Sequence, residues 1–135
     1  MKKSDFRKGQ TVFLLRIGDS ARGRKTVQER IVAATVASVG RKYITVDRGF
    51  SYLVQFEIDR DFRQRTNYSP NYALFLDEKE IYRCCERESM ERNIRDALRW
   101  DRNVLRVMSF DDVQAVHSII SKYMEDKENG QTTEL

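Results

Sequence analysis

The chain has 135 residues and a mass of 16.0 kDa, about the size of one domain, and 34% of its side chains are charged. Its mean hydropathy is −0.67 and no segment approaches the ~20 apolar residues of a membrane span, which argues against a membrane protein. The two cysteines, Cys84 and Cys85, are adjacent, which excludes a disulfide framework and a zinc site built on cysteine pairs. The polar start of the chain shows no signal peptide, so we expect a cytoplasmic location.

The charge balance changes near Leu76. Residues 1–76 hold 15 basic and 7 acidic side chains, whereas residues 77–135 hold 10 basic and 14 acidic ones. Arginine, whose planar guanidinium suits phosphate and carboxylate groups, makes up 17 of the 25 basic residues. This asymmetry indicates an anionic partner for the first half, or an attraction between the two halves within the fold.

The first half has the glycine-punctuated, alternating pattern of short β-strands. The clearest example is Phe50–Asp59, in which every second residue from Phe50 to Ile58 is apolar. Gly40 marks a tight hairpin, because glycine tolerates the positive φ that such turns require. The predicted strands are Gln10–Ile17, Val27–Val39, Arg41–Asp47, Phe50–Asp59 and Tyr72–Leu76.

Short strands in this number do not make a stable flat sheet with two open edges. Curling into a barrel removes the edges and encloses a single core. We therefore expect residues 1–76 to form a small SH3-like β-barrel.

The second half has the periodicity of helices. Asp77 and Ser109 are each followed three residues later by an acidic residue, as at helix N-termini. After Ser109 the apolar residues recur every three or four positions, which predicts an amphipathic helix. The predicted fold is thus α+β, with a helical appendage of two or three helices over residues 77–125 and a flexible tail over residues 126–135.

Residues 78–102 carry two apolar stripes that face nearly opposite directions on one helix. One stripe contains Ile81 and the cysteines, and the other contains Met90, Ile94 and Ala97. We favour a helix break at Ser89, a residue suited to an N-cap. The alternative is one long helix contacted on both sides, which argues for a dimer.

The sequence has no signature of a reaction. The sole histidine, His117, has no second imidazole and no cysteine at metal-binding spacing beside it. Glu57, Asp59 and Asp61 alternate along one strand, where three carboxylates could hold a divalent cation for hydrolysis. Arginines crowd that region, so a metal-dependent hydrolase is the weakest of the hypotheses considered. We therefore expect no enzyme, no metal site and no cofactor.

Two segments are better candidates for function. The loop Gly18–Thr26 carries cations without any large hydrophobic side chain, and Arg60–Tyr72 interleaves arginines with aromatic rings. Cations that pair with phosphates, beside rings that stack on bases, are what a binder of RNA or single strands needs. If the barrel gathers these segments on one rim, the predicted nucleic-acid interface is Arg22, Arg24, Lys25, Arg41, Lys42, Arg60, Arg63, Arg65 and Tyr68.

A second hypothesis is a protein-interaction or homodimeric assembly module, because helices bury unmatched apolar stripes somewhere. The residues of that interface would be Met90, Ile94, Leu98 and Trp100.

One part of the first half begins with Lys8-Gly9-Gln10-Thr11-Val12, continues through a basic loop and a long strand, and ends with residues 39–46. This part resembles KOW-type and other SH3-like small barrels. The whole chain is similar to uncharacterised barrel proteins found in prophages and mobile elements of Gram-positive bacteria. The resemblance implies a cytoplasmic bacterial or phage accessory protein.

Overall fold

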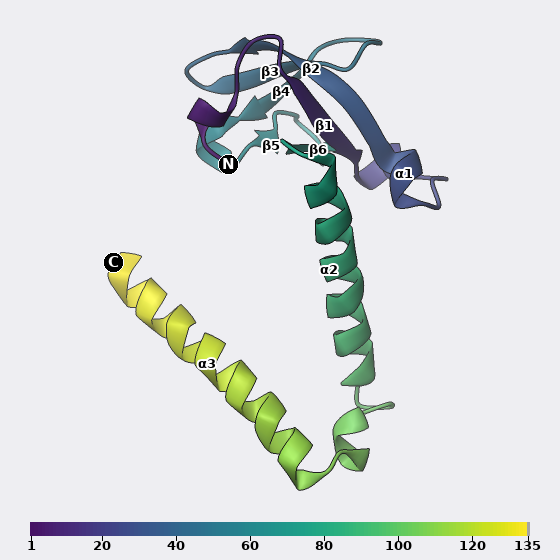
Figure 1. Cartoon of the computed structure of the whole chain (residues 1–135), viewed down its shortest axis with the longest axis vertical. Coiled ribbons are helices and arrows are strands. Elements are labelled where there is room, and N and C mark those ends of the chain that lie inside the picture. The colour runs from purple at the N-terminus through teal and green to yellow at the C-terminus, as the bar shows by residue number, and fades with distance from the viewer. Residues whose placement is uncertain (135) are drawn as a thin grey trace. The chain divides into compact units, whose positions relative to one another are not determined.

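The computed structural model describes the backbone of residues 1–134 and the side chains of residues 1–127 (Figure 1). The chain divides into two compact units, of which the first is Met1–Glu88 and the second begins at Ser89. Each unit is described by itself. The predicted flexible tail, residues 126–135, lies largely outside the described side chains and stays a prediction.

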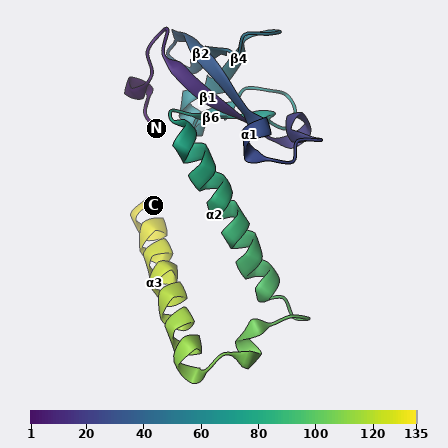
Figure 2. The same ribbon diagram turned by 45° about the vertical axis from the view of Figure 1, so that its right-hand side comes forward.

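The first unit is a nearly closed barrel of six antiparallel strands, in the order β5-β4-β3-β2-β1-β6. The strands curl around one core, as the two views in Figure 1 and Figure 2 show. This confirms the α+β class and the small barrel, whereas the SH3-like assignment stays a prediction. The strands are β1 (Thr11–Arg16), β2 (Ile31–Val39), β3 (Tyr43–Asp47), β4 (Val54–Glu57), β5 (Arg63–Gln64) and β6 (Tyr72–Phe75).

A buried glutamine joins the two edge strands of the barrel. The Gln64 side-chain Oε1 accepts hydrogen bonds from the backbone N–H groups of Asn71, at 2.7 Å, and Tyr72, at 2.9 Å. Gln64 is the only polar side chain buried among the described residues. The Gln64 amide therefore connects β5 to the start of β6 at the seam, where elsewhere in the sheet a ladder of backbone hydrogen bonds connects neighbouring strands.

The core follows the alternation of the strands. Inward-facing residues from five strands pack together, and their outward-facing neighbours are exposed or half-buried except for Leu15, which is buried outside this cluster. Phe6, which precedes the first strand, reaches the same core and its ring contacts that of Phe62 at a centroid distance of 5.3 Å. The fully buried side chains of the barrel strands are Val12, Leu14, Val36, Ile44, Val46 and Phe56.

Two predicted strands are shorter than expected. Val27–Arg30 forms a helical turn, α1, because the Thr26 hydroxyl accepts a hydrogen bond from the Glu29 N–H at 3.2 Å and starts a helix there. Phe50–Asp59 forms a strand only over Val54–Glu57. The preceding residues turn away, with Gly49 at φ +86°.

The predicted hairpin at Gly40 is confirmed, but for a different reason. The Gly40 N–H donates to the Tyr43 carbonyl oxygen at 2.9 Å, which closes the turn between β2 and β3. Gly40 is not in the left-handed region. A Cβ there would lie 3.4 Å from the Tyr43 oxygen, so close backbone approach favours glycine.

Both predicted helix starts are confirmed. Helix α2 (Glu78–Ala97) begins after Asp77, whose carboxylate accepts from the Lys79 N–H at 3.0 Å. Helix α3 (Phe110–Glu134) begins after Ser109, whose hydroxyl accepts from the Asp112 N–H at 3.2 Å. Short 3-10 turns occupy Lys3–Asp5, Gly18–Ala21, Ile58–Arg60 and Val104–Val107.

The favoured helix break at Ser89 is wrong, because α2 runs without interruption through that residue. Its neighbours are mostly good helix formers, and one serine inside a helix costs only about 0.5 kcal/mol. The two apolar stripes fall in different units. Ile81 is fully buried within the first, while Met90 and Ile94 belong to the second. No helix among the described residues is long and apolar enough to cross a membrane.

Candidate functional site

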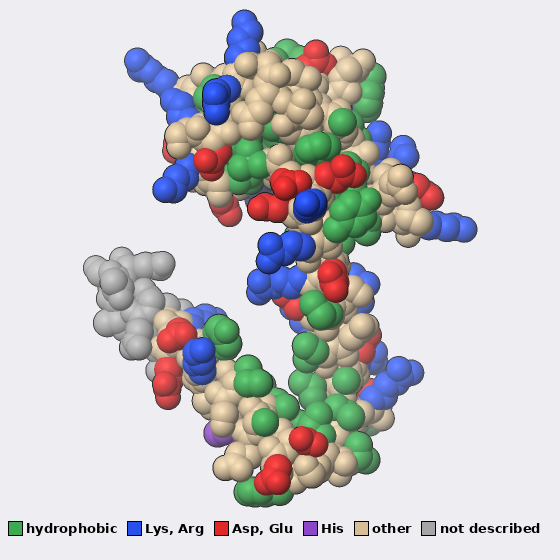
Figure 3. All heavy atoms as spheres, viewed as in Figure 1, with side chains coloured by type: hydrophobic (Ala, Val, Ile, Leu, Met, Phe, Trp, Pro, Cys, Tyr) green, Lys and Arg blue, Asp and Glu red, His purple; other side chains and the backbone are tan. Residues whose placement is uncertain are grey.

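The predicted basic residues lie at two ends of the barrel. The loop Gly18–Thr26 leads into the start of β2, whereas the hairpin Gly40–Lys42 follows its end. β2 has nine residues and spans roughly 25 Å at ~3.3 Å per residue. On the face shown in Figure 3, Lys and Arg side chains project from several separate places around the barrel. The two segments therefore do not share one rim.

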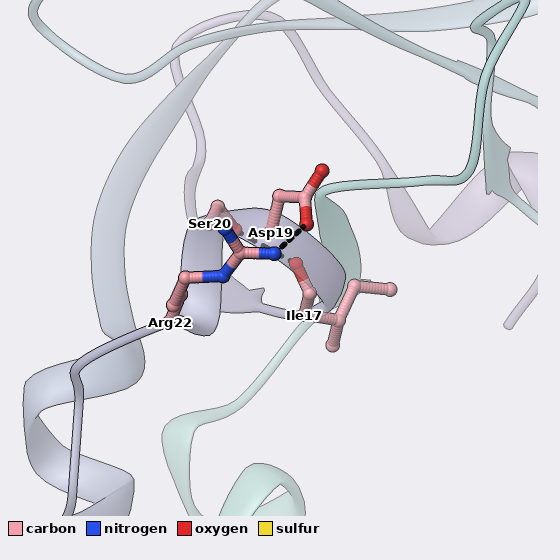
Figure 4. A network of polar contacts seen from close by, with 4 residues as sticks. All are labelled: Ile17, Asp19, Ser20 and Arg22. Atoms are coloured by element: carbon pink, nitrogen blue, oxygen red, sulfur yellow. Dashed lines mark hydrogen bonds and ion pairs between the residues drawn. The ribbon is translucent and has the colours of Figure 1, made fainter.

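The loop Gly18–Thr26 is held by its own contacts. The Arg22 Nη2 lies 3.1 Å from the Asp19 Oδ1 (Figure 4), an exposed pair of small energetic value. The Arg24 guanidinium donates to the Glu29 carbonyl oxygen at 3.3 Å, and the Lys25 N–H donates to the Glu29 carboxylate at 2.9 Å. Part of the loop's charge is thus matched within the chain.

The start of this loop packs on the segment before β6. The Ser20 hydroxyl contacts the carbonyl oxygens of Ile17, at 2.9 Å, and Asn71. Gly18 is in the left-handed region at φ +56°, and a Cβ there would lie 3.0 Å from the Pro70 oxygen. These contacts place the loop at the barrel end where Tyr72 begins β6.

The other basic residues gather at the opposite end or along β5. Arg41 and Lys42 are exposed at the hairpin tip, and Arg63 pairs in register with Glu57. The Arg60 Nε lies 3.6 Å from the Glu57 carboxylate. That these arginines and Lys42 bind nucleic acid stays a prediction.

Arg65 and Tyr68 follow β5. The Arg65 guanidinium lies over the Tyr43 ring, 5.0 Å from its centroid, and donates to the Gln55 Oε1 at 3.1 Å. Tyr68 is 84% exposed on the adjoining loop.

The predicted carboxylate trio does not form a metal centre. Glu57 is paired with Arg60, and Asp61 turns the chain at φ +54°. Within residues 1–127, no three histidine, cysteine or acidic side chains come together in a group that could hold a metal ion.

The predicted assembly residues lie in the second unit. Ile94 and Leu98 line an apolar groove of about 320 Å³ together with Ile119 and Ile120 of α3. Met90 and Trp100 are exposed and do not line this groove.

The barrel holds a cluster that the sequence patterns missed. Two half-buried arginines, Arg16 at the end of β1 and Arg48 after β3, converge on the Tyr72 hydroxyl. The Arg48 guanidinium lies 4.6 Å from the Phe50 ring centroid and 5.0 Å from those of Tyr52 and Tyr72. The Arg16 guanidinium lies 5.8 Å from the rings of Phe50 and Tyr72. We call these five residues the arginine–aromatic cluster.

The cluster carries positive charge that the chain does not neutralise. Neither Arg16 nor Arg48 forms an ion pair with a carboxylate of the described residues. The Nε atoms of both are buried and donate no hydrogen bond to any of those residues. Two guanidiniums that donate to the same hydroxyl repel each other, and partial burial strengthens that repulsion. An anion bound between them would remove that repulsion.

A hollow of about 390 Å³ adjoins the cluster at Tyr52. Tyr52 both lines this hollow and lies against Arg48, so the two features share one ring. Polar side chains from β4, β5 and the following loop form the other walls. We call it the Tyr52 hollow, and its lining includes Tyr52, Leu53, Gln55, Arg65, Thr66 and Asn67.

The cysteines show no sign of activation. Burial raises the pKa of the Cys84 thiol, with the neighbouring Glu88 adding to the effect, and burial also raises the pKa of Cys85. Both thiols are therefore protonated at neutral pH, which makes them poor nucleophiles.

Comparison with curated proteins and with solved structures finds no match. The model of one protein family, the Phage ProQ C-terminal-like domain, matches residues 1–128, which cover both the barrel and the helices. The chain is therefore a phage-related domain and belongs to the Phage ProQ C-terminal-like domain family.

Proposed function

We propose that this domain is a non-enzymatic module that binds nucleic acid through the arginine–aromatic cluster. The observation that carries the proposal is the pair of half-buried guanidiniums, Arg16 and Arg48, without a carboxylate partner among the described residues. Arginine binds phosphate through parallel N–H donors, and partial burial strengthens each such contact.

The surroundings favour a nucleic acid over a free anion. Phe50 and Tyr52 are 48% and 70% exposed next to the guanidiniums, and exposed rings beside cations stack on bases. The basic loop Gly18–Thr26 lies at the same end of the barrel and offers further phosphate contacts. We assign peripheral contacts with the nucleic acid to three of the predicted interface residues, Arg22, Arg24 and Lys25.

Salt-dependent binding tests the proposal. The affinity of a fluorescein-labelled, mixed-sequence RNA for the whole chain, measured by anisotropy, should fall steeply between 50 and 200 mM salt because counterions are released. Arg48→Gln should weaken binding at least fivefold. Arg106→Gln, which removes the same charge from the second unit, should change it less than twofold. Absence of binding at low salt, or equal effects of the two variants, contradicts the proposal.

A second candidate function is self-association through the helices. Not one described residue from Ser89 to Lys127 is buried, although α3 carries a row of large apolar side chains. Two helices with an uncovered apolar face gain stability by burying it against another copy. Sedimentation across a concentration series tests this, and a strict monomer at high concentration contradicts it.

A further inference from the structure

The Tyr52 hollow combines a flat aromatic ring with polar walls. Its lining residues include the aromatic Tyr52, the amide-bearing Gln55 and Asn67, and the hydroxyl-bearing Thr66. Its volume of about 390 Å³ lies in the range of pockets that hold small organic groups. An aromatic face with amides at the side is complementary to a nucleobase, which has a flat ring and polar edges.

The hydrogen bonds in the hollow leave capacity for such a group. The Gln55 Oε1 accepts from Arg65 at 3.1 Å, and its amide nitrogen reaches the Thr45 hydroxyl at 3.5 Å, so Gln55 is held in place. The Asn67 amide makes no side-chain hydrogen bond within the part of the chain whose side chains are described. Asn67 therefore offers a donor and an acceptor to a base edge.

The arginine–aromatic cluster and the Tyr52 hollow share the ring of Tyr52. Arg48 lies 5.0 Å from the Tyr52 centroid, so a base stacked on Tyr52 places its own phosphates near Arg48 and Arg16. We infer that the domain binds single-stranded nucleic acid, with one unpaired base in the Tyr52 hollow and a flanking phosphate on Arg16 and Arg48. This inference rests on the proposed function and specifies its ligand.

The geometry excludes a base that is still in a duplex. Bases in a double helix are stacked on both faces and paired along one edge, so none can enter a side pocket without leaving the stack. A single strand meets no such barrier, and stacking on a protein aromatic ring changes affinity by about 1–3 kcal/mol per base.

The experiment compares a single-stranded RNA of 12 nucleotides with the same strand in a duplex, by anisotropy on the whole chain. The wild-type chain should bind the single strand at least tenfold more tightly. Tyr52→Leu should reduce that affinity about tenfold, whereas Tyr52→Phe should stay within about threefold of wild type because the ring is kept. Tyr82→Leu is the matched control, since Tyr82 is 42% exposed on α2 and belongs to neither the hollow nor the arginine–aromatic cluster; it should change binding less than twofold.

The outcomes separate the two proposals. If the wild-type chain binds neither RNA at low salt, both the proposed function and this inference fail. If it binds both RNAs equally, or if Tyr52→Leu has no more effect than Tyr82→Leu while Arg48→Gln still weakens binding, only this inference is overturned. Circular dichroism of each variant checks that the barrel is intact, which the exposure of both tyrosines leads us to expect.

Discussion

The side-chain oxygen of Gln64 accepts a hydrogen bond from the backbone N–H of Tyr72 at 2.9 Å, which joins the last two strands of the barrel across its seam. The same residue that starts β6 also presents its hydroxyl to the two arginines of the cluster. Tyr72 therefore takes part both in closing the barrel and in holding the arginine–aromatic cluster together.

Removal of the Gln64 amide should destabilise the barrel. Gln64→Ala leaves two backbone N–H groups without their acceptor, and each buried unsatisfied group costs about 1–3 kcal/mol. We expect the free energy of unfolding in urea to fall by about 3 kcal/mol. Gln28→Ala, at an exposed position in α1, should change it by less than about 0.5 kcal/mol. Similar values for the two variants would show that the seam does not need the glutamine.

Inorganic phosphate should stabilise the wild-type chain through Arg16 and Arg48. For a dissociation constant near 10 mM, 100 mM phosphate adds about 1.4 kcal/mol to folding and raises the melting temperature by several degrees. Sodium chloride at matched ionic strength should not produce this shift, and neither should phosphate added to Arg48→Gln. A shift of equal size in the variant would place the anion elsewhere.

A charge in the apolar groove should prevent self-association. Ile119→Glu puts a carboxylate where α3 faces Ile94 and Leu98, and desolvating it in an interface is unfavourable. If the wild-type chain dimerises as proposed, sedimentation of this variant should give a monomer at the same concentrations. Gln114→Glu adds the same charge to an exposed position of α3 outside the groove and should leave the dimer intact. Loss of the dimer in both variants would indicate a general charge effect.

The cysteines should react slowly with an alkylating reagent. The raised pKa of Cys84 and Cys85 leaves less thiolate at pH 7.5 than a free cysteine has, and the thiolate is the reactive form. We expect iodoacetamide to modify the folded chain several-fold more slowly than the urea-unfolded chain, and the rate to rise with pH beyond pH 9. Equal rates in the folded and unfolded chains would contradict the assigned burial.

The parts of the fold that were predictable are those in which local pattern and tertiary packing agree. The sequence predicts a strand over Arg41–Asp47, and within it Ile44 and Val46 of β3 are buried while Tyr43 and Thr45 are half-buried. The capping residues Asp77 and Ser109 also act locally, so their short-range hydrogen bonds identify both helix starts. Strand β5 has two residues, too few to produce a pattern.

Phe50 and Tyr52 show why alternation can mislead. They continue the apolar spacing of β4, but Gly49 at φ +86° and Ser51 at φ +59° turn the chain out of the strand. Their rings pack against Arg48 instead of entering the core. The left-handed conformation of a serine is set by the surrounding structure, so the sequence predicts a strand where the fold makes a loop.

The arginine–aromatic cluster could not be read from spacing. Arg16 and Arg48 are 56 and 24 positions from Tyr72, and only barrel closure brings them to its hydroxyl. Local counts of basic residues instead select clusters such as Arg22 to Lys25, in which Arg22 forms an ion pair with Asp19. One available signal was Arg16 itself, a charged residue that ends an otherwise apolar strand.

The unbroken course of α2 limits where the chain can be shortened. Ile81, near the start of that helix, is completely buried within the first unit, although it does not belong to the core cluster of the strands. A truncation after Leu76 would remove this buried side chain from the first unit, and one after Glu88 would cut α2 in its middle. A fragment meant to keep the barrel should therefore retain the whole helix through Ala97.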